Sequence, residues 1–261
     1  MNSDFDDDLT ACARLVERGD PDRFRAVMAA PVAARRGLFP LYAFNLEVAR
    51  APWVTQEPMI AQMRLQWWRD ALAEIAAGGP VRRHEVVTPL ALVLDGEAAH
   101  LLDALIVARH RDLEKTMFED ETALWSYLEN TSGRLLDVAA RILGRPLPAG
   151  LAADAGAAFG LARWFLAIPE LEEAGRAPLP DGRSAAVADL AGRGLERLAN
   201  ARRVAPALAA AQRPALYPLA GTGAILSRVA RRPGRVAAGE ARPGQLRDRV
   251  ALMRMALTGR F

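Results

Sequence analysis

Cysteine, lysine and histidine are scarce in this 261-residue chain. The lone cysteine, Cys12, can form neither an internal disulfide nor a cysteine-based zinc site, which favours a reducing compartment. The three histidines, His84, His100 and His110, lack the spacing of a helical metal-ligand pair. The sequence therefore predicts neither a disulfide-stabilised secreted protein nor a transition-metal site.

Long apolar runs and an N-terminal targeting signal are also missing. No apolar run approaches the roughly 18 to 20 residues that span a bilayer. The first eight residues include four aspartates, whereas signal and transit peptides begin with basic residues. We therefore expect a cytoplasmic protein, either free or peripheral on the inner membrane.

Two local patterns resemble ligand sites but lack the necessary context. Asp4 and Asp8 stand one helical turn apart, which could hold Mg²⁺, but they lie in a terminal run that we expect to be a solvated acidic tail. The pairs Gly156/Gly160 and Gly221/Gly223 follow no predicted strand and lack a phosphate-loop lysine. We expect these glycines to serve close helix packing and helix termini.

Arginine supplies nearly all of the positive charge: Lys115 is the only lysine among 34 basic residues, against 31 acidic ones. A net charge of +3 is too small to indicate nucleic-acid binding, and no nucleic-acid motif accompanies the arginines. Residues 228–260, however, include nine arginines and only two acidic residues. This C-terminal region could meet an anionic membrane surface; alternatively, the arginine-rich composition simply spreads charge everywhere.

Helix formers dominate, and alternating strand patterns are rare. We expect an all-α fold with an acidic N-terminal segment and first helix in residues 1–20, followed by one helical domain over 21–261. Pro58 should open a helix that stops at Gly78. The other predicted helices cover residues 35–49, 100–118, 121–143, 151–168, 185–211, 214–230 and 244–257.

Three extended blocks, at residues 35–49, 57–72 and 127–133, combine aromatic and polar side chains. Polar residues there lie beside apolar positions and need buried partners if they face inward. These blocks, with Gly175-Arg176 and Leu179-Pro180 after them, resemble in order and spacing the squalene/phytoene synthase family. The resemblance runs over about residues 23–180 and implies a single-domain isoprenoid-synthase-like bundle around a central cavity.

The resemblance also implies two aspartate clusters that bind Mg²⁺ and a prenyl diphosphate, and here the chain departs from it. The positions of the first cluster hold Ala49, Arg50 and Trp53. Those of the second hold Ala167, Glu170 and Leu171, so a single acid remains. Mg²⁺ is held through carboxylates and substrate phosphates, and we therefore expect no metal cofactor. The alternative is an active head-to-head prenyl-diphosphate transferase with an altered, Mg²⁺-dependent site that relies on Glu170.

The amino-acid sequences of the three blocks are similar to those of one subfamily. That subfamily assists assembly of mitochondrial respiratory complex I and also lacks the two aspartate clusters. The similarity rests on Phe44-Asn45-Leu46-Glu47, on Met63-Arg64-Leu65-Gln66 and on Tyr127-Leu128-Glu129-Asn130-Thr131. It implies a non-catalytic protein whose partner is a respiratory-complex subunit or an isoprenoid or lipid-like ligand.

We expect a polar group to line the former active cavity, with no catalytic or metal-binding residue assigned. Ionisable groups gathered in a cleft are candidates for function, although structural ion pairs give the same pattern. Arg50 with Glu47, or Arg64 with Glu129, could simply neutralise each other. The candidates are Asn45, Glu47, Arg50, Arg64, Gln66, Asp112, Tyr127, Glu129, Asn130 and Glu170.

Overall fold

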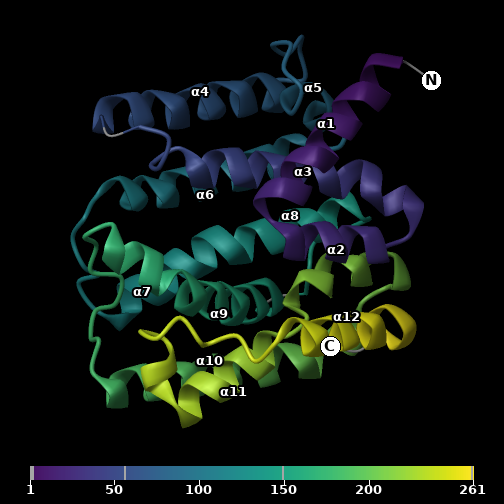
Figure 1. Ribbon diagram of the computed structural model, residues 1–261. Coiled ribbons are helices and arrows are strands. Elements are labelled where there is room, and N and C mark those ends of the chain that lie inside the picture. Colours follow the sequence, from purple (N-terminus) through teal and green to yellow (C-terminus); the bar gives the residue numbers. More distant parts are fainter. Residues whose placement is uncertain (1–2, 56, 149, 260) are drawn as a thin grey trace. The chain divides into compact units, whose positions relative to one another are not determined.

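The computed structural model describes residues 3–55, 57–148, 150–259 and 261, and within them it contains helices joined by loops and no strand (Figure 1). This confirms the all-α prediction. Whereas the sequence predicts one helical domain over 21–261, the contacts divide the chain into two compact units. Unit 1 comprises residues 1–113, 137–146 and 211–218, and unit 2 comprises 114–136, 147–210 and 219–261.

Unit 1 is built on a central helix, α3, against which α1 and α2 pack, while α4 packs along α6 (Figure 1). Leu38, Leu41 and Phe44 on α3 are fully buried and form part of the core of this unit. The elements are α1 (Ser3–Gly19), α2 (Pro21–Ala29), α3 (Val32–Arg50), α4 (Pro58–Ala76), α5 (Val87–Ala91), α6 (Gly96–Arg109) and the 3-10 turn η1 (His110–Leu113).

Unit 2 is centred on the long helix α9 (Leu151–Glu173), which packs against α10 and a short π-helix, η2. The chain passes from unit 2 to unit 1 within α8 (Arg134–Ile142), and η4 (Ala210–Leu219) belongs mainly to unit 1. The remaining elements of unit 2 are α7 (Glu121–Leu128), η2 (Glu129–Gly133), α10 (Ser184–Val204), η3 (Ala205–Ala207), α11 (Thr222–Arg231), η5 (Pro233–Arg235) and α12 (Gln245–Thr258).

Local sequence signals set several helix starts. The side chains of Asp20, Asp95 and Asp120 each accept a hydrogen bond from the backbone N–H three residues on, which satisfies a donor that the first turn leaves open. Pro58 occupies the first turn of α4 as predicted, since its missing N–H is not needed there. The predicted helix at 244–257 also corresponds closely to α12.

Four predicted helix extents were wrong. The segment predicted as a helix at 185–211 leaves the α-helix after Val204 and continues as η3. The segment 100–118 leaves the α-helix at Arg109 and continues as η1, and the segment 121–143 is interrupted by η2. The segment 214–230 is 3-10 helix up to Leu219 because Pro214 and Pro218 each remove a backbone donor; α11 begins only after Gly221, whose φ is +85°.

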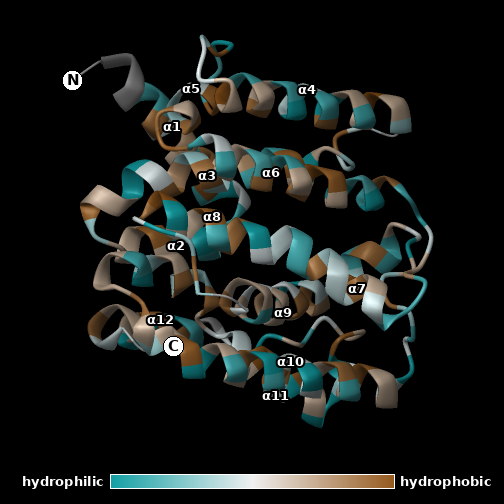
Figure 2. Ribbon diagram, turned by 180° about the vertical axis from the view of Figure 1, so that it is seen from behind, coloured by the Kyte–Doolittle hydropathy of each residue, from teal (hydrophilic) through white to brown (hydrophobic). Residues whose placement is uncertain are grey.

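The helix predicted at 151–168 continues through Pro169 to Glu173. A proline near a helix end removes one hydrogen bond, while residues after it still bond; Ala174 N donates to Glu170 O at 3.0 Å. Helix α9 is thereby long and apolar enough to cross a membrane by length and composition, contrary to our expectation from the apolar runs (Figure 2). Since 61% of its apolar window is buried, α9 has the packing of a core helix.

The expectation of a solvated acidic tail was wrong for Asp8. Asp8 lies on α1 with only 5% of its surface exposed, and Arg83 Nη2 donates to its Oδ1 at 3.0 Å. A buried carboxylate requires such a partner because desolvation penalises its charge. The side chains of Asp4 and Asp6 lie outside the described part of the structure.

Cys12 lies on the buried face of α1, where its Sγ donates to Glu85 O at 3.3 Å. Burial, reinforced by the negative charges of Glu85 and Asp8, raises the pKa of the thiol from 9.0 to about 12. The native thiol is therefore protonated at pH 8. Because the folded-state pKa lies above the unfolded one, this group's contribution to stability is lost as the pH rises from about 9 towards 12.

We predict that a thiol reagent such as dithionitrobenzoate modifies native Cys12 at pH 8 about 1000-fold more slowly than the chain unfolded in guanidinium, since the thiolate is the reacting form. Absorbance of the released thionitrobenzoate measures both rates. Equal rates in the folded and unfolded chain would contradict the assigned burial.

Candidate functional site

The candidate residues of unit 1 begin at the C-terminal end of α3. Asn45 is buried, as its apolar neighbours suggested. Glu47 Oε1 lies 3.9 Å from Arg50 Nη1, so these two residues pair as one of our alternatives proposed. Arg50 is half exposed, and an ion pair of this length in partial contact with solvent is weak.

The positions that the family resemblance assigns to a first aspartate cluster lie in this same segment. They carry the methyl group of Ala49, the guanidinium of Arg50 and the indole of Trp53. A magnesium ion requires oxygen ligands, and none of these three side chains supplies one. This donor set therefore does not fit Mg²⁺.

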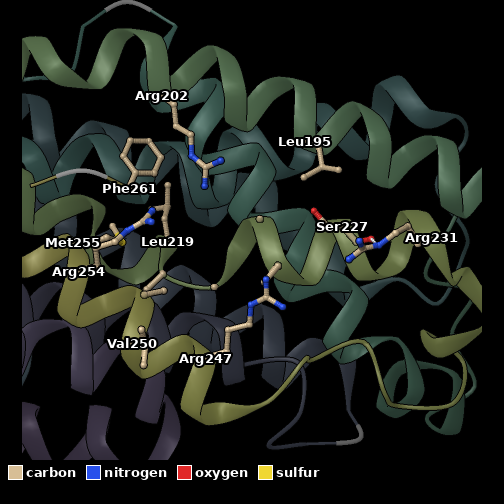
Figure 3. A pocket seen from close by; sticks show the side chains of 15 residues that line it. Leu195, Arg202, Leu219, Ser227, Arg231, Arg247, Val250, Arg254, Met255 and Phe261 are labelled. Atoms are coloured by element: carbon tan, nitrogen blue, oxygen red, sulfur yellow. Dashed lines mark hydrogen bonds between the residues drawn. The ribbon is translucent and has the colours of Figure 1, made fainter. Parts of the chain in front are cut away.

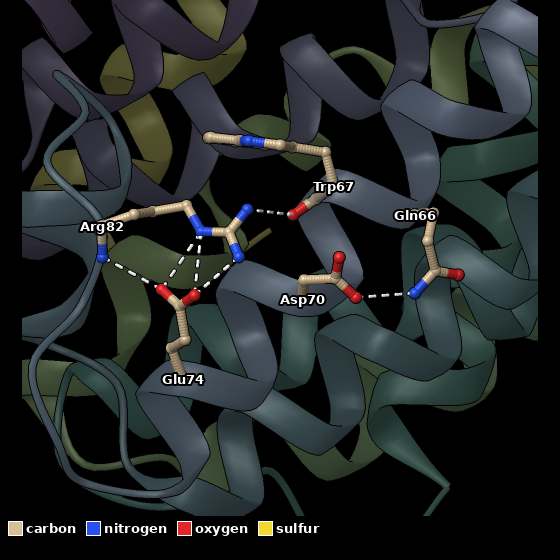
Figure 4. Close-up of polar contacts among 5 residues, drawn as sticks. All are labelled: Gln66, Trp67, Asp70, Glu74 and Arg82. Carbon is tan, nitrogen blue, oxygen red and sulfur yellow. Dashed lines mark hydrogen bonds and ion pairs between the residues drawn. The ribbon is translucent and has the colours of Figure 1, made fainter.

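Helix α4 carries Arg64 and Gln66, which are both exposed. Gln66 Nε2 donates to Asp70 Oδ1 at 2.7 Å, one turn further along the helix (Figure 4). Nearby, Arg82 clamps Glu74, with Nη2 2.6 Å from Oε1, and its Cζ lies 4.9 Å from the Trp67 ring centroid. The amide of Gln66 thus has a local partner on its own helix.

The aromatic residues of α4 pack into unit 1. Trp68 is buried, with its ring centroid 5.4 Å from that of Phe44 and 5.4 Å from that of His84. Trp67 is half buried and contacts the same histidine, whereas Trp53 is 47% exposed. Trp68 and Phe44 are therefore core residues of this unit, and His84 belongs to an aromatic cluster.

Asp112 lies in η1, immediately after α6, and its side chain is 11% exposed. Its Oδ2 accepts a hydrogen bond from Arg109 Nη1 at 3.0 Å. The two partners of this charge-assisted hydrogen bond are three residues apart in the sequence, and the arginine neutralises the carboxylate within unit 1.

In unit 2 the block 127–133 forms the end of α7 and the π-helix η2. Glu129 Oε1 accepts a hydrogen bond from Arg197 Nη1 on α10 at 2.5 Å, and the same nitrogen lies 3.7 Å from Asp154 Oδ1 on α9. Arg197 Cζ also lies 4.5 Å from the Trp125 ring centroid, within cation–π range. Glu129 thus has its arginine partner within unit 2, and the alternative pairing with Arg64 stays a prediction.

Side chains of the π-helix bond the carbonyls of the turn before it. Thr131 Oγ1 donates to Tyr127 O at 2.7 Å, and Asn130 Nδ2 donates to Ser126 O at 2.8 Å. Side-chain bonds of this kind compete with the regular helical ladder, and π-turns inside helices often mark functional sites. Asn130 is half buried and also accepts from Arg134 Nε at 2.9 Å.

Close backbone packing fixes η2 against α9. A Cβ at Gly156 would overlap Gly133 Cα and lie 2.6 Å from Gly133 N, and a Cβ at Gly160 would lie 2.8 Å from Ser132 Oγ. Gly156 and Gly160 therefore serve close helix packing, as predicted. Their lack of side chains brings Glu129 and Asp154 to the same arginine.

Tyr127 is buried in an aromatic cluster. Its ring centroid lies 5.5 Å from that of Phe118 and 5.4 Å from that of Trp164 on α9. Trp164 Nε1 in turn donates to Pro178 O at 2.8 Å, which ties the loop after α9 to the helix. Tyr127 thus links α7 to α9 and to the Leu179-Pro180 element.

The family model for squalene/phytoene synthase matches residues 16–183. This chain belongs to the squalene/phytoene synthase family. Among curated relatives, the complex I assembly factor 6 homologue of Drosophila melanogaster is 33% identical over 167 residues, which cover 60% of this chain and 50% of that protein. Assembly factor 6 of Homo sapiens is 27% identical over 139 residues, which cover 51% and 40%. The match thus spans half or less of each relative.

Two solved structures confirm the isoprenoid-synthase-like fold. A dehydrosqualene synthase, crystallised with a ligand, superposes with a TM-score of 0.78 at 14% identity and covers 96% of both chains. The squalene synthase HpnC of Alicyclobacillus acidocaldarius superposes with a TM-score of 0.70 at 18% identity and covers 90% of this chain and 97% of its own. At these identities the likeness establishes the fold alone.

For the family's second acidic cluster, this chain offers Glu170 on α9, which is exposed, between the apolar residues Ala167 and Leu171. Within the described residues, no three His, Cys, Asp or Glu side chains gather in a group that could hold a metal ion. The other acidic residues of the candidate site each have an arginine partner; they are Glu47, Asp112, Glu129 and Asp154.

Sequence reasoning missed Arg197, which pairs with Glu129, and also Asp154 and Trp125, which both contact Arg197. Arg197 stands 68 residues after Glu129 in the sequence, and no local spacing links them. The only available signal was the amphipathic pattern of α10, which cannot name the partner of a charged side chain.

Proposed function

We propose that this protein is a non-catalytic member of the squalene/phytoene synthase family that assists assembly of a respiratory complex of the complex I type. The observation that carries the proposal is the donor set at the end of α3, where Ala49, Arg50 and Trp53 offer no oxygen ligand. Coupling of prenyl diphosphates requires neutralising the charge of the leaving diphosphate, and metal ions held by carboxylates are the usual means.

The arginine partners of the carboxylates support the same proposal. An arginine that pairs with Glu129 and Asp154 competes directly with a divalent cation for their oxygens. The neutralised network is suited to holding α7, α9 and α10 together as a rigid scaffold. Scaffolding without turnover is what an assembly factor requires, and the curated relatives are named as complex I assembly factors.

The proposed partner is a respiratory-complex subunit or an isoprenoid or lipid-like ligand. We place the protein in the cytoplasm, peripheral to the inner membrane where such a complex is built. This location agrees with the arginine excess between residues 228 and 260, which would favour an anionic surface.

Deletion of the gene in its host tests the proposal. We expect the amount of fully assembled complex I on native gels to fall, with NADH-dehydrogenase activity of membranes falling in parallel. The wild-type gene and the Glu170→Ala variant should restore it equally, because no acid-dependent chemistry is involved. Unchanged complex I in the deletion strain, or failure of Glu170→Ala to restore it while the variant accumulates normally, would contradict the proposal.

A further inference from the structure

A pocket of about 510 Å³ lies within unit 2, where α10, α11 and α12 meet (Figure 3). It is separate from the π-helix network and uses none of the candidate residues considered above. Its volume falls within the range of pockets that take small organic ligands. We call it the C-terminal arginine pocket, defined by the side chains of Arg202, Arg231, Arg247 and Arg254 and the apolar residues between them.

The four arginines are exposed to solvent, and their guanidinium groups line one pocket. None of the lining residues that the structure describes is acidic, and no ion pair involves any of the four within the described chain. Arg231 Nε donates to a backbone carbonyl, Ser227 O, at 3.1 Å. Elsewhere in unit 2, Arg197 and Arg183 pair with carboxylates, whereas Arg203 and Arg228 bond an amide oxygen and a backbone carbonyl. What distinguishes the four arginines is that they line one pocket.

Two of these guanidinium groups repel each other. Burial and the charge of Arg254 both lower the pKa of Arg202. Like charges that face a shared space disfavour each other's charged form, and a bound anion would remove that cost. An anion with several oxygens could accept hydrogen bonds from both guanidinium groups at once.

The start of α11 also lies at the pocket, with the carboxylate of Asp248 against Gly221. Gly221, Gly223 and Ala224 line the pocket, and α11 begins there without a side-chain cap. A Cβ at Gly223 would lie 3.3 Å from Arg202 Nη2, so this guanidinium rests against the positive end of the helix. Asp248, which lies beside Gly221, pairs with Arg242 at 3.3 Å and does not line the pocket.

Apart from Ser227, the other side chains of the wall are apolar. Leu195, Leu219, Val250, Met255 and Phe261 contribute to it, and the Phe261 ring centroid lies 5.9 Å from Arg202 Cζ (Figure 3). Val250 is 57% exposed and lies on a helix, α12, whose Leu246, Met253 and Leu257 are exposed as well. Positive and apolar surfaces in one pocket match a ligand with an anionic head and an apolar chain.

We propose that the C-terminal arginine pocket binds a phosphate or diphosphate group that carries an apolar chain, without a metal ion. The head lies among the four guanidinium groups and the start of α11, and the chain lies on the apolar wall towards α12. This chemistry is shared by soluble phosphorylated amphiphiles and by membrane phospholipids. The proposal uses no residue of the assigned family site, but it rests on the lipid-like ligand and the C-terminal arginines that the proposed function also names. Binding assays on the pocket variant test it separately from complex I assembly.

Isothermal titration of the full chain in the presence of EDTA tests the proposal. The probes are inorganic pyrophosphate and dihexanoyl phosphatidic acid, and flotation with phosphatidylglycerol vesicles tests the membrane source against phosphatidylcholine vesicles. The pocket variant is Arg202→Gln/Arg254→Gln. The control is Arg203→Gln/Arg249→Gln, which removes the same charge from exposed neighbours on the same two helices that do not line the pocket.

We expect the wild type and the control to bind phosphatidic acid alike, and the pocket variant to lose about 10- to 100-fold in affinity, as the loss of charge-assisted hydrogen bonds predicts. Binding to phosphatidylglycerol vesicles alone, lost in the pocket variant only, also supports the proposal and identifies the membrane as the source. Equal losses in both double variants, or no binding to any probe, would overturn it. Pyrophosphate binding as tight as that of phosphatidic acid would overturn the role of the apolar wall.

The pocket variant should remain folded, because it removes charges that repel each other. Its thermal midpoint is expected to equal or exceed that of the wild type. The shift of that midpoint by phosphatidic acid then gives a second readout, which the pocket variant should lack and the control should retain.

Discussion

Replacing Gly156 with alanine lowers the free energy of unfolding by about 3 kcal/mol, the upper part of the range for overpacked cores. The new methyl group would overlap Gly133 Cα and lie 2.9 Å from the Ser132 carbonyl carbon, so it meets backbone rather than a flexible side chain. The helices α9 and η2 must then separate. Urea unfolding, followed by circular dichroism, measures the change.

Gly192→Ala is the matched control for this substitution. Gly192 lies inside α10, and nothing stands within 4 Å of the Cβ position. Alanine at this position should raise the free energy of unfolding by up to about 1 kcal/mol, since glycine is the poorer helix former. If both variants change stability in the same direction and by the same amount, the close packing of α9 on η2 is not what Gly156 provides.

Arg83→Met lowers the free energy of unfolding by about 2 kcal/mol, because it leaves the carboxylate of Asp8 buried without its ion-pair partner. Arg83 itself is 62% exposed at the side chain, so its own removal costs little packing. Urea unfolding at pH 7 measures the effect.

The double variant Asp8→Asn/Arg83→Met separates charge from packing. Asparagine has nearly the shape of aspartate but no charge, and it should recover most of the lost stability. A double variant as unstable as Arg83→Met alone would mean that the buried charge of Asp8 is not the cause. A double-mutant cycle with the two single variants quantifies the pair.

Helix positions were predictable wherever a helix begins at a residue with a local start signal, such as a first-turn proline or a capping aspartate. Pro58 opens α4 and Asp95 caps α6, because a first-turn proline or a capping carboxylate satisfies requirements of the helix backbone itself. The π-turn at Glu129–Gly133 was not predictable, because it follows from contacts with α9. Periodicity alone indicated one continuous helix there.

The ion-pair partners of charged residues were likewise predictable where they are close in sequence and unpredictable where they are distant. Glu47 and Arg50 stand one turn apart, so their pairing could be proposed from spacing. Asp8 with Arg83 and Glu129 with Arg197 join distant segments, and only the packing of helices brings them together. The C-terminal arginine pocket is a similar case: the sequence revealed an excess of arginine, and the fold reveals which of these residues face one another.

The account of function depends on what the family site can bind. The chain keeps the fold of the dehydrosqualene and squalene synthases that it resembles, while the end of α3 carries a methyl, a guanidinium and an indole. A positively charged Arg50 at this place repels a divalent cation as well as failing to coordinate it.

Titration of the full chain with farnesyl diphosphate, in Mg²⁺ and separately in EDTA, tests this central claim most directly. We predict that the two isotherms superimpose and that no inorganic diphosphate is released in Mg²⁺. Any binding common to both conditions should be lost in Arg202→Gln/Arg254→Gln, which assigns it to the C-terminal arginine pocket. A component of binding that requires Mg²⁺ and disappears in Glu170→Ala would contradict the account and identify the chain as an active prenyl-diphosphate transferase.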